Sequence, residues 1–287
     1  MPRSIVDYTL DTTEVSKSVL IELMTALKSY SDALVLVGGW VPYFLLEKYK
    51  REDNPFEHIG SIDIDIAVDP RIVSSDVYAT IVEIIKDRGY APRKDINGNI
   101  IQYSFERKIN SPEDDKEYII SVDFLSTQFE KQQRHRQVQQ DLRARTMRGC
   151  TAVFKHYIRY ELKGILPNNG ETSVKMKIAD VVGCITTKGI ALGERYKEKD
   201  AYDIYSIVAN YKNGPKDVAG EIVPFIKEEL VKESIENIKN RFKSINGVGP
   251  VWVANFLNPT SKEEKERIMA DAFMNVSELI RIVGEYR

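Results

Sequence analysis

Apolar positions follow two different periods in the amino-terminal part of the chain. After Asp11 and Glu14, which are typical of a helix start, they recur at helical spacing and predict an amphipathic helix. The apolar positions of this helix are Val15, Val19, Leu20, Leu23 and Leu27. Between Ile62 and Val68 the period is two, so isoleucines point one way and Asp63 and Asp65 the other. This alternation predicts a half-buried strand with two carboxylates on one face.

A short apolar run, Leu34 to Val37, precedes Gly38 and Gly39, and a second helical pattern follows directly. The order is therefore strand, glycine turn, helix. Glycines allow a tight turn and close backbone approach to a phosphate, and the start of the following helix would present free N–H groups to an anion.

The middle of the chain is strand-rich. Asn97-Gly98 is a strong hairpin signal, and Asp123 lies between Val122 and Phe124 in a further strand-like run. A third carboxylate is therefore expected inside a strand. The predicted strands are Ile100 to Phe105, Tyr118 to Leu125, Thr151 to Glu161 and Thr172 to Ile178, with a helix from Val73 to Arg88.

From about Ala179 onward the pattern is helical, with Pro215 opening one late helix and Ser261 capping another. These elements predict an α/β fold of the α+β type, in which a mixed-sheet core is followed by a helical carboxy-terminal domain. We place the core domain at residues 1–178 and the helical domain at 179–287.

Composition narrows the class of protein. The 287 residues are 43% hydrophobic and 29% charged, and their formal net charge is −2, so no global charge attracts nucleic acid or membranes. Cys150 and Cys184 lack the paired spacing of a zinc site, and two cysteines are too few for a secreted disulfide scaffold, so a reducing cytoplasm is the expected compartment. No apolar run approaches membrane-spanning length. Charge is concentrated locally from Lys131 to Arg148, which favours a solvated face or helix over a nucleic-acid site.

The candidate chemistry is phosphoryl transfer. A nucleoside triphosphate brings several negative charges together, so an enzyme that acts on it needs clustered carboxylates to hold divalent cations. Asp63 and Asp65 project in the same direction from one strand, and hard oxygen ligands suit Mg²⁺. Asp123 would complete the cluster, either as a third metal ligand or by activating the attacking hydroxyl. Alternating Ile and Asp also fits a plain amphipathic strand with a solvated face.

Two sequence blocks carry a resemblance. Leu36-Val37-Gly38-Gly39-Trp40, followed by Ser61-Ile62-Asp63-Ile64-Asp65-Ile66-Ala67-Val68, resembles the signature of the DNA polymerase beta-like nucleotidyltransferases. The segment from Lys188 to Asp203 resembles a later motif of their AbiEii/AbiGii branch, which includes the MenT-type toxins. Trp40 stands where many members of the superfamily carry serine, so one hydroxyl contact to phosphate is absent.

The resemblance implies a function and a set of roles. It implies transfer of a nucleoside monophosphate from ATP, GTP or CTP to an acceptor hydroxyl, with two Mg²⁺ ions, for which Mn²⁺ substitutes. The implied metal ligands are Asp63, Asp65 and Asp123, and the catalytic set adds Lys188 and Asp200. The implied nucleotide-binding residues are Gly38, Gly39, Trp40, Lys188 and Arg195. The implied acceptor is tRNA or protein, in a toxin paired with a cognate antitoxin, or else a small molecule such as an aminoglycoside.

Two other classes of function remain open from the sequence. A catalytically silent module would bind nucleotide without releasing pyrophosphate. An RNA-binding protein working through Lys131 to Arg148 would bind RNA in a salt-sensitive way without Asp63 and Asp65. Substitution of these two aspartates separates all three classes.

Overall fold

The computed structural model describes residues 4–73, 80–110, 116–128 and 134–286. Within these ranges the chain divides into two compact units, each made of segments that are distant in sequence. One unit contains Thr9–Gly39 and Ser61–Ala179; we call it the sheet unit. The other contains the residues up to Tyr8, together with Trp40–Gly60 and Asp180–Arg287; we call it the helical unit. The predicted domain of residues 1–178 thus contains two segments that group with the carboxy-terminal helices.

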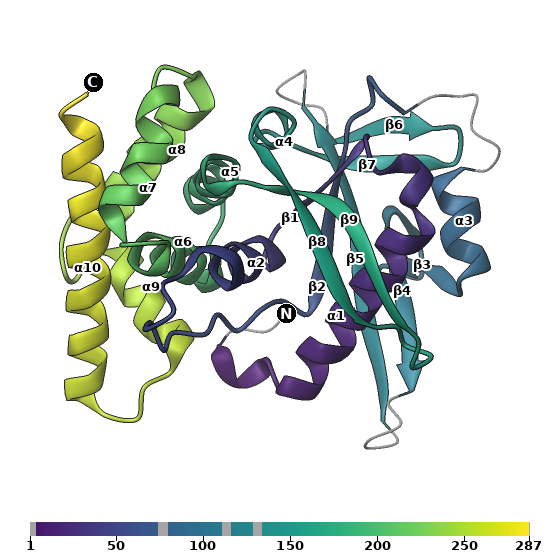
Figure 1. Cartoon of the computed structure of the whole chain (residues 1–287), viewed down its shortest axis with the longest axis horizontal. Coiled ribbons are helices and arrows are strands. Elements are labelled where there is room, and N and C mark those ends of the chain that lie inside the picture. Colours follow the sequence, from purple (N-terminus) through teal and green to yellow (C-terminus); the bar gives the residue numbers. More distant parts are fainter. Residues whose placement is uncertain (1–3, 74–79, 111–115, 129–133, 287) are drawn as a thin grey trace. The chain divides into compact units, whose positions relative to one another are not determined.

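The sheet unit is a mixed sheet with helices (Figure 1). Its described strands follow the order β3-β4-β5-β2-β1-β9-β8, and a hairpin of β6 and β7 joins through β7 to β5. Its strands are β1 (Leu34–Val37), β2 (Asp63–Val68), β3 (Tyr90–Lys94), β4 (Ile100–Asn110), β5 (Glu117–Thr127), β6 (His135–Gln139), β7 (Leu142–Met147), β8 (Tyr157–Ile165) and β9 (Glu171–Ala179). Its helices are α1 (Leu10–Ala26), η2 (Lys28–Tyr30), α3 (Ile81–Asp87) and α4 (Cys150–Val153).

The two faces of this sheet differ in polarity. In β2 and β5, Ile64, Ile66, Val122 and Phe124 are fully buried and share one face. α1 packs on that face: its Glu22 forms an ion pair of 3.0 Å with Arg107, which is in register with Ile120 of the same face. The aspartates of β2 and β5 alternate with these apolar residues and therefore project from the opposite face.

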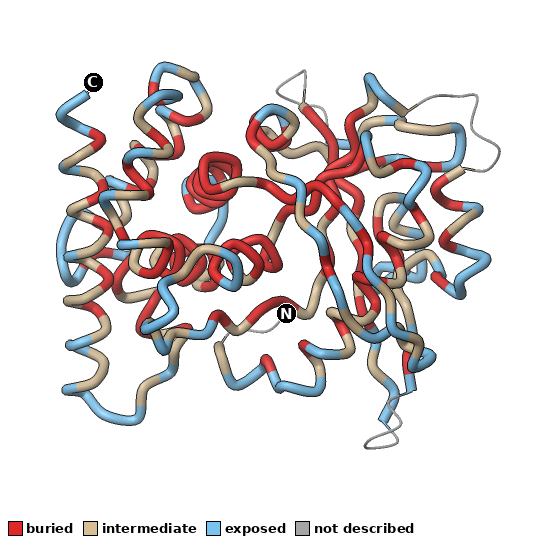
Figure 2. Tube along the Cα trace, viewed as in Figure 1, coloured by how far each residue is buried: buried red, intermediate tan, exposed pale blue. Residues whose placement is uncertain are grey.

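The helical unit contains η1 (Ile5–Asp7), α2 (Trp40–Tyr49), α5 (Val181–Glu194), α6 (Glu198–Asn210), α7 (Pro215–Ile222), η3 (Val223–Phe225), α8 (Glu229–Arg241), α9 (Val248–Leu257) and α10 (Lys262–Gly284). α5 and α6 are buried along most of their length, whereas α10 buries one stripe (Figure 2). Such all-round burial identifies α5 and α6 as the core of this unit. The predicted fold class, a mixed sheet followed by carboxy-terminal helices, is confirmed.

Several predicted boundaries were wrong. The first helix begins at Leu10, because Thr9, and not Asp11, caps it by accepting a hydrogen bond from the Thr12 N–H. The segment after Cys150 opens with one helical turn in place of a strand, since Cys150 and Val153, three residues apart, are both buried there. Only Ile81–Asp87 of the predicted Val73 to Arg88 helix is helical, and residues 74–79 of that range lie outside the described ranges.

Candidate functional site

Three carboxylates share the polar face of the sheet unit. Asp63 and Asp65 are two residues apart on β2, and parallel pairing with β5 sets Asp65 directly beside Asp123. The same register sets Asp63 beside Ser121. Since residues in register on neighbouring strands project from the same face, the three predicted carboxylates point in one direction.

The glycine turn approaches this carboxylate face closely. Gly38 follows β1 with a φ of +76°, a left-handed conformation that L side chains rarely adopt. A Cβ added at Gly38 would lie 2.1 Å from the Asp65 Oδ2 atom and 2.9 Å from the Asp65 Cβ. Both the backbone angle and the space therefore require glycine here, and the turn lies against a predicted metal ligand.

The surroundings of Asp123 determine its hydrogen bonding and shift its pKa. Its Oδ1 accepts a hydrogen bond from the Ser104 hydroxyl, which is in turn 3.2 Å from Nη1 of Arg93. Burial raises the pKa of Asp123 above its usual value, and the Asp63 charge acts in the same direction, whereas Ser104, Arg93 and Arg145 oppose the rise. A carboxylate with a raised pKa is a better proton acceptor than an ordinary aspartate.

The donor chemistry of this face fits a hard cation. Carboxylate oxygens are the ligands that Mg²⁺ prefers, and Asp63, Asp65 and Asp123 supply them from two adjacent strands. Across the described ranges, the side chains as placed do not bring three His, Cys, Asp or Glu residues around one point. The sequence thus supplies three carboxylate donors, and the strand register places them on a common face.

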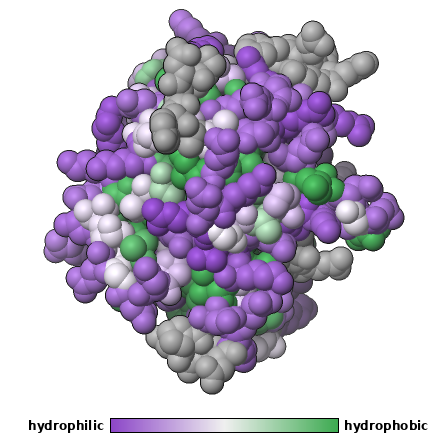
Figure 3. Space-filling model, turned by 90° about the vertical axis from the view of Figure 1, so that its right-hand side faces the viewer, coloured by the Kyte–Doolittle hydropathy of each residue, from purple (hydrophilic) through white to green (hydrophobic). Residues whose placement is uncertain are grey.

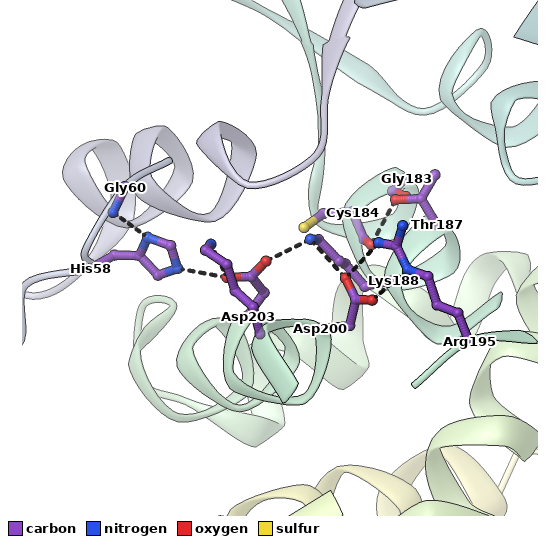
Figure 4. A network of polar contacts seen from close by, with 10 residues as sticks. His58, Gly60, Gly183, Cys184, Thr187, Lys188, Arg195, Asp200 and Asp203 are labelled. Carbon is purple, nitrogen blue, oxygen red and sulfur yellow. Dashed lines mark hydrogen bonds and ion pairs between the residues drawn. The ribbon is translucent and has the colours of Figure 1, made fainter. Parts of the chain in front are cut away.

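The predicted residues Lys188 and Asp200 meet in a buried polar network of the helical unit (Figure 4). The Lys188 Nζ atom lies 3.2 Å from Asp200 Oδ1 and 2.5 Å from Asp203 Oδ2. Burial alone would lower the pKa of Lys188, but the Asp203 and Asp200 charges outweigh it and hold the pKa above the usual value. Lys188 is therefore a charged ammonium held between two carboxylates.

Asp203 is the centre of this network. Besides Lys188, it binds Lys199 through a 2.8 Å contact and lies 3.1 Å from His58 Nε2. Burial opposes ionisation of Asp203, yet the two ammonium groups and His58 hold its pKa well below the usual range. Lys199 differs from Lys188, because burial outweighs the pull of Asp203 and lowers its pKa.

His58 was missed by the sequence interpretation, which assigned no histidine to the site. The Gly60 N–H donates to His58 Nδ1 over 3.1 Å, so Nδ1 accepts and Nε2 carries the proton that faces Asp203. Burial lowers the pKa of His58 to about 4, with the positive charges of Lys199 and Lys188 acting in the same direction. His58 is thus a neutral hydrogen-bond donor to Asp203 at neutral pH.

Arg195 connects the network to the surface. Its guanidinium donates to both oxygens of Asp200, at 2.8 Å and 3.0 Å, while 48% of its side chain remains exposed. Burial would raise the pKa of Asp200, but Lys188 and Arg195 together lower it. The bidentate contact fixes the direction of the Arg195 side chain.

Trp40 takes a packing position in the helical unit. Its ring is 1% exposed and stacks on Phe44 with centroids 5.5 Å apart. α2 begins at Trp40, directly after Gly39. Any contact of Trp40 with a nucleotide would therefore come from its backbone. That Trp40 binds the nucleotide stays a prediction, and it now concerns the backbone at the start of α2.

The basic segment is a hairpin. Lys131 lies outside the described residues, and most of the remainder forms β6 and β7, so the helical alternative was wrong. Arg134, Arg143 and Arg145 are exposed, as a solvated face requires. Figure 3 shows the side of the molecule that carries β6 and α3, where the described surface is mainly hydrophilic.

Neither cysteine is exposed, and burial raises the pKa of the Cys184 thiol to about 12. Burial also raises the pKa of Cys150, with the Asp65 charge adding to the effect. Two uncharged thiols of this kind are poor nucleophiles.

Among the described helices, none combines the length and apolar character that a bilayer crossing requires.

Comparisons with known proteins give two structural likenesses. No protein-family model matches the chain, and no curated protein matches it. JHP933 from Helicobacter pylori aligns with a TM-score of 0.45 and 12% identity, over 96% of this chain and 95% of that one. A candidate nucleotidyltransferase from H. pylori aligns with the same score and identity, over 97% and 99% of the two chains. The resemblance to the AbiEii/AbiGii branch remains a prediction from the sequence.

Proposed function

We propose that this protein is a magnesium-dependent nucleotidyltransferase. In the proposed reaction an acceptor hydroxyl attacks the α-phosphorus of a nucleoside triphosphate, the bond to the β-phosphate oxygen breaks, and pyrophosphate leaves. The observation that supports this most strongly is the row of Asp63, Asp65 and Asp123 on one face of β2 and β5, with the Gly38 turn against Asp65. Carboxylates grouped beside a glycine turn suit a substrate that carries several phosphate charges.

The carboxylates have separate roles in this proposal. Asp63 and Asp65 would hold Mg²⁺, which when bound neutralises phosphate charge and polarises the phosphoryl oxygens. Asp123, whose pKa is raised, would accept the proton of the acceptor hydroxyl. The Ser104 hydrogen bond fixes one oxygen of Asp123, which leaves the other for this proton.

The sequence resemblance implies that Lys188 and Arg195 contact the triphosphate. Lys188 is bound to Asp200 and Asp203 in the structure, so a phosphate contact requires that it exchange one of these partners. Arg195 is bound to both oxygens of Asp200, and 48% of its side chain is exposed. Of the two cations, Arg195 is therefore the more accessible to a phosphate.

The acceptor is the finer part of the proposal. The sequence resemblance to toxins of the AbiEii/AbiGii branch favours tRNA or protein over a small molecule such as an aminoglycoside, and with it a cognate antitoxin. Labelled transfer into total RNA, into protein or into small molecules distinguishes these acceptors in a single assay.

The test uses purified protein with Mg²⁺, each labelled triphosphate in turn, and cell extract. Asp65→Asn keeps the shape of the side chain and removes its charge, and we expect it to lower transfer at least about 100-fold. Glu117→Gln is the matched control, because Glu117 is an exposed carboxylate of the same strand and face as Asp123. Equal transfer by the parent and Asp65→Asn would refute the assignment, as would nucleotide binding by the parent without pyrophosphate release from any triphosphate.

A further inference from the structure

An aromatic ring of the helical unit is left in water. Tyr196 lies in the short link between α5 and α6 and is 83% exposed. Its ring meets the half-buried Trp252 of α9 edge to face, with centroids 5.8 Å apart and planes at 78°. With this exposure, most of the Tyr196 ring surface is accessible to a ligand.

A guanidinium group completes the arrangement. Arg241, the last residue of α8, lies 5.5 Å from the Tyr196 centroid and 5.8 Å from the Trp252 centroid. Both distances fall within the range of cation–π attraction. We call Tyr196, Arg241 and Trp252 the aromatic platform.

Contacts behind the platform fix Arg241 and the backbone segments that carry Tyr196 and Trp252. Arg241 Nε donates to the Leu192 carbonyl oxygen over 3.3 Å, which ties the end of α8 to α5. Arg195, beside Tyr196 in the chain, is held by both oxygens of Asp200. Asn255 of α9 donates to Glu198 of α6 over 3.1 Å. The platform is therefore ordered before any ligand arrives, which lowers the entropic cost of binding.

The chemistry of the platform selects its ligand. An exposed tyrosine ring offers a face for stacking a flat heterocycle, and Arg241 offers positive charge for a phosphate. A nucleobase that carries a phosphate has both features, and base–aromatic stacking tolerates any base. We propose that the aromatic platform binds a nucleobase by stacking on Tyr196 while Arg241 binds its phosphate.

This binding goes beyond the proposed transfer reaction and does not require it. The carboxylates of β2 and β5 belong to the sheet unit, whereas every residue of the platform belongs to the helical unit. The base and phosphate could belong to a free nucleotide or to a single strand, and these sources share the same chemistry. Binding without Mg²⁺, which prevents transfer, therefore tests the platform separately.

Tryptophan fluorescence provides the measurement. The chain has two tryptophans: Trp40 is buried, and Trp252 forms part of the platform. Quenching that is lost in Tyr196→Ala therefore reports on Trp252. The full-length protein is titrated without Mg²⁺ with AMP, CMP, adenosine and a ten-nucleotide oligo-uridylate. We expect saturable quenching by the monophosphates, and tighter binding of the oligonucleotide if the natural ligand is a single strand.

Two variants and one control decide the outcome. We expect Tyr196→Ala to weaken binding roughly 10- to 100-fold, and Arg241→Gln to weaken the binding of AMP but not of adenosine. Tyr286→Ala removes a different exposed ring and is expected to bind as the parent does. Binding unchanged in Tyr196→Ala, or no saturable quenching of the parent by millimolar AMP, would overturn the proposal. Transfer activity retained in Tyr196→Ala would leave the proposed function intact in either case.

Discussion

Replacement of Gly38 by alanine tests whether the glycine turn must lie against Asp65. Gly98 is the matched control, because its φ of +84° is also left-handed but a Cβ there meets no atom within 4 Å. Both substitutions incur the cost of a left-handed L residue, roughly 1–2 kcal/mol, offset by about 0.4–1 kcal/mol from the stiffer unfolded chain. We therefore expect Gly98→Ala to lower the free energy of unfolding by about 1 kcal/mol.

Gly38→Ala adds a steric cost that Gly98→Ala lacks. The new Cβ would be 2.1 Å from Asp65 Oδ2 and 2.9 Å from Asp65 Cγ, so either the carboxylate rotates or β1 and β2 separate. Overpacking of this kind costs about 1–3 kcal/mol, which brings the expected total to about 2–4 kcal/mol. Because the carboxylate is displaced, nucleotidyl transfer should also fall sharply, whereas Gly98→Ala should keep it.

Urea unfolding followed by circular dichroism measures both losses, with the slope compared between variants. A double variant sharpens the result: Asp65→Ala removes Oδ2 and Cγ, so adding Gly38→Ala to it should cost about 1 kcal/mol less than adding it to the parent. Equal destabilisation by Gly38→Ala and Gly98→Ala, or full transfer by Gly38→Ala, would refute the reasoning.

Two further predictions concern the buried network of the helical unit. The pKa of His58 is lowered to about 4 in the folded protein, against about 6.5 in the unfolded chain. As pH falls through this window only the unfolded chain takes up the proton, so stability should fall by about 3 kcal/mol, and His58→Gln should remove most of that dependence. An imidazole resonance of His58 that titrates near pH 6.5 would contradict the prediction. Asp203→Asn leaves Lys188 and Lys199 without a shared carboxylate, and we expect a loss of about 3–5 kcal/mol in urea unfolding. A loss below about 1 kcal/mol would show that water or another group already balances these charges.

The carboxylate face was largely predictable from the sequence. Alternation of isoleucine and aspartate placed Asp63 and Asp65 on one side of a strand, and the same period placed Asp123 inside another. Their common face was not predictable, because it depends on parallel pairing of β2 with β5, strands separated by more than one other element. A shift of that register by one residue would have turned Asp123 to the apolar face.

The buried network was predictable only in part. Lys188 and Asp200 came from the resemblance, and Asp203 lay at the end of the same block without a role. The three-residue spacing of Asp200 and Asp203 on a predicted helix was the available signal, since such residues share a helix face. His58 gave no signal, because its contact with Asp203 joins residues 145 positions apart. Contacts of this range are a property of the tertiary fold.

The helical unit has a consequence for how the chain is made. α2 ends at Tyr49, but α5 and α6, the helices it packs against, begin only at Val181. At a synthesis rate of about 10 residues per second, the apolar side of α2 waits on the order of ten seconds for its partners. A fragment that stops near residue 178 would contain the strands of the sheet but would lack α5 and α6, against which α2 packs. We therefore expect such a fragment to give a poor yield of folded protein.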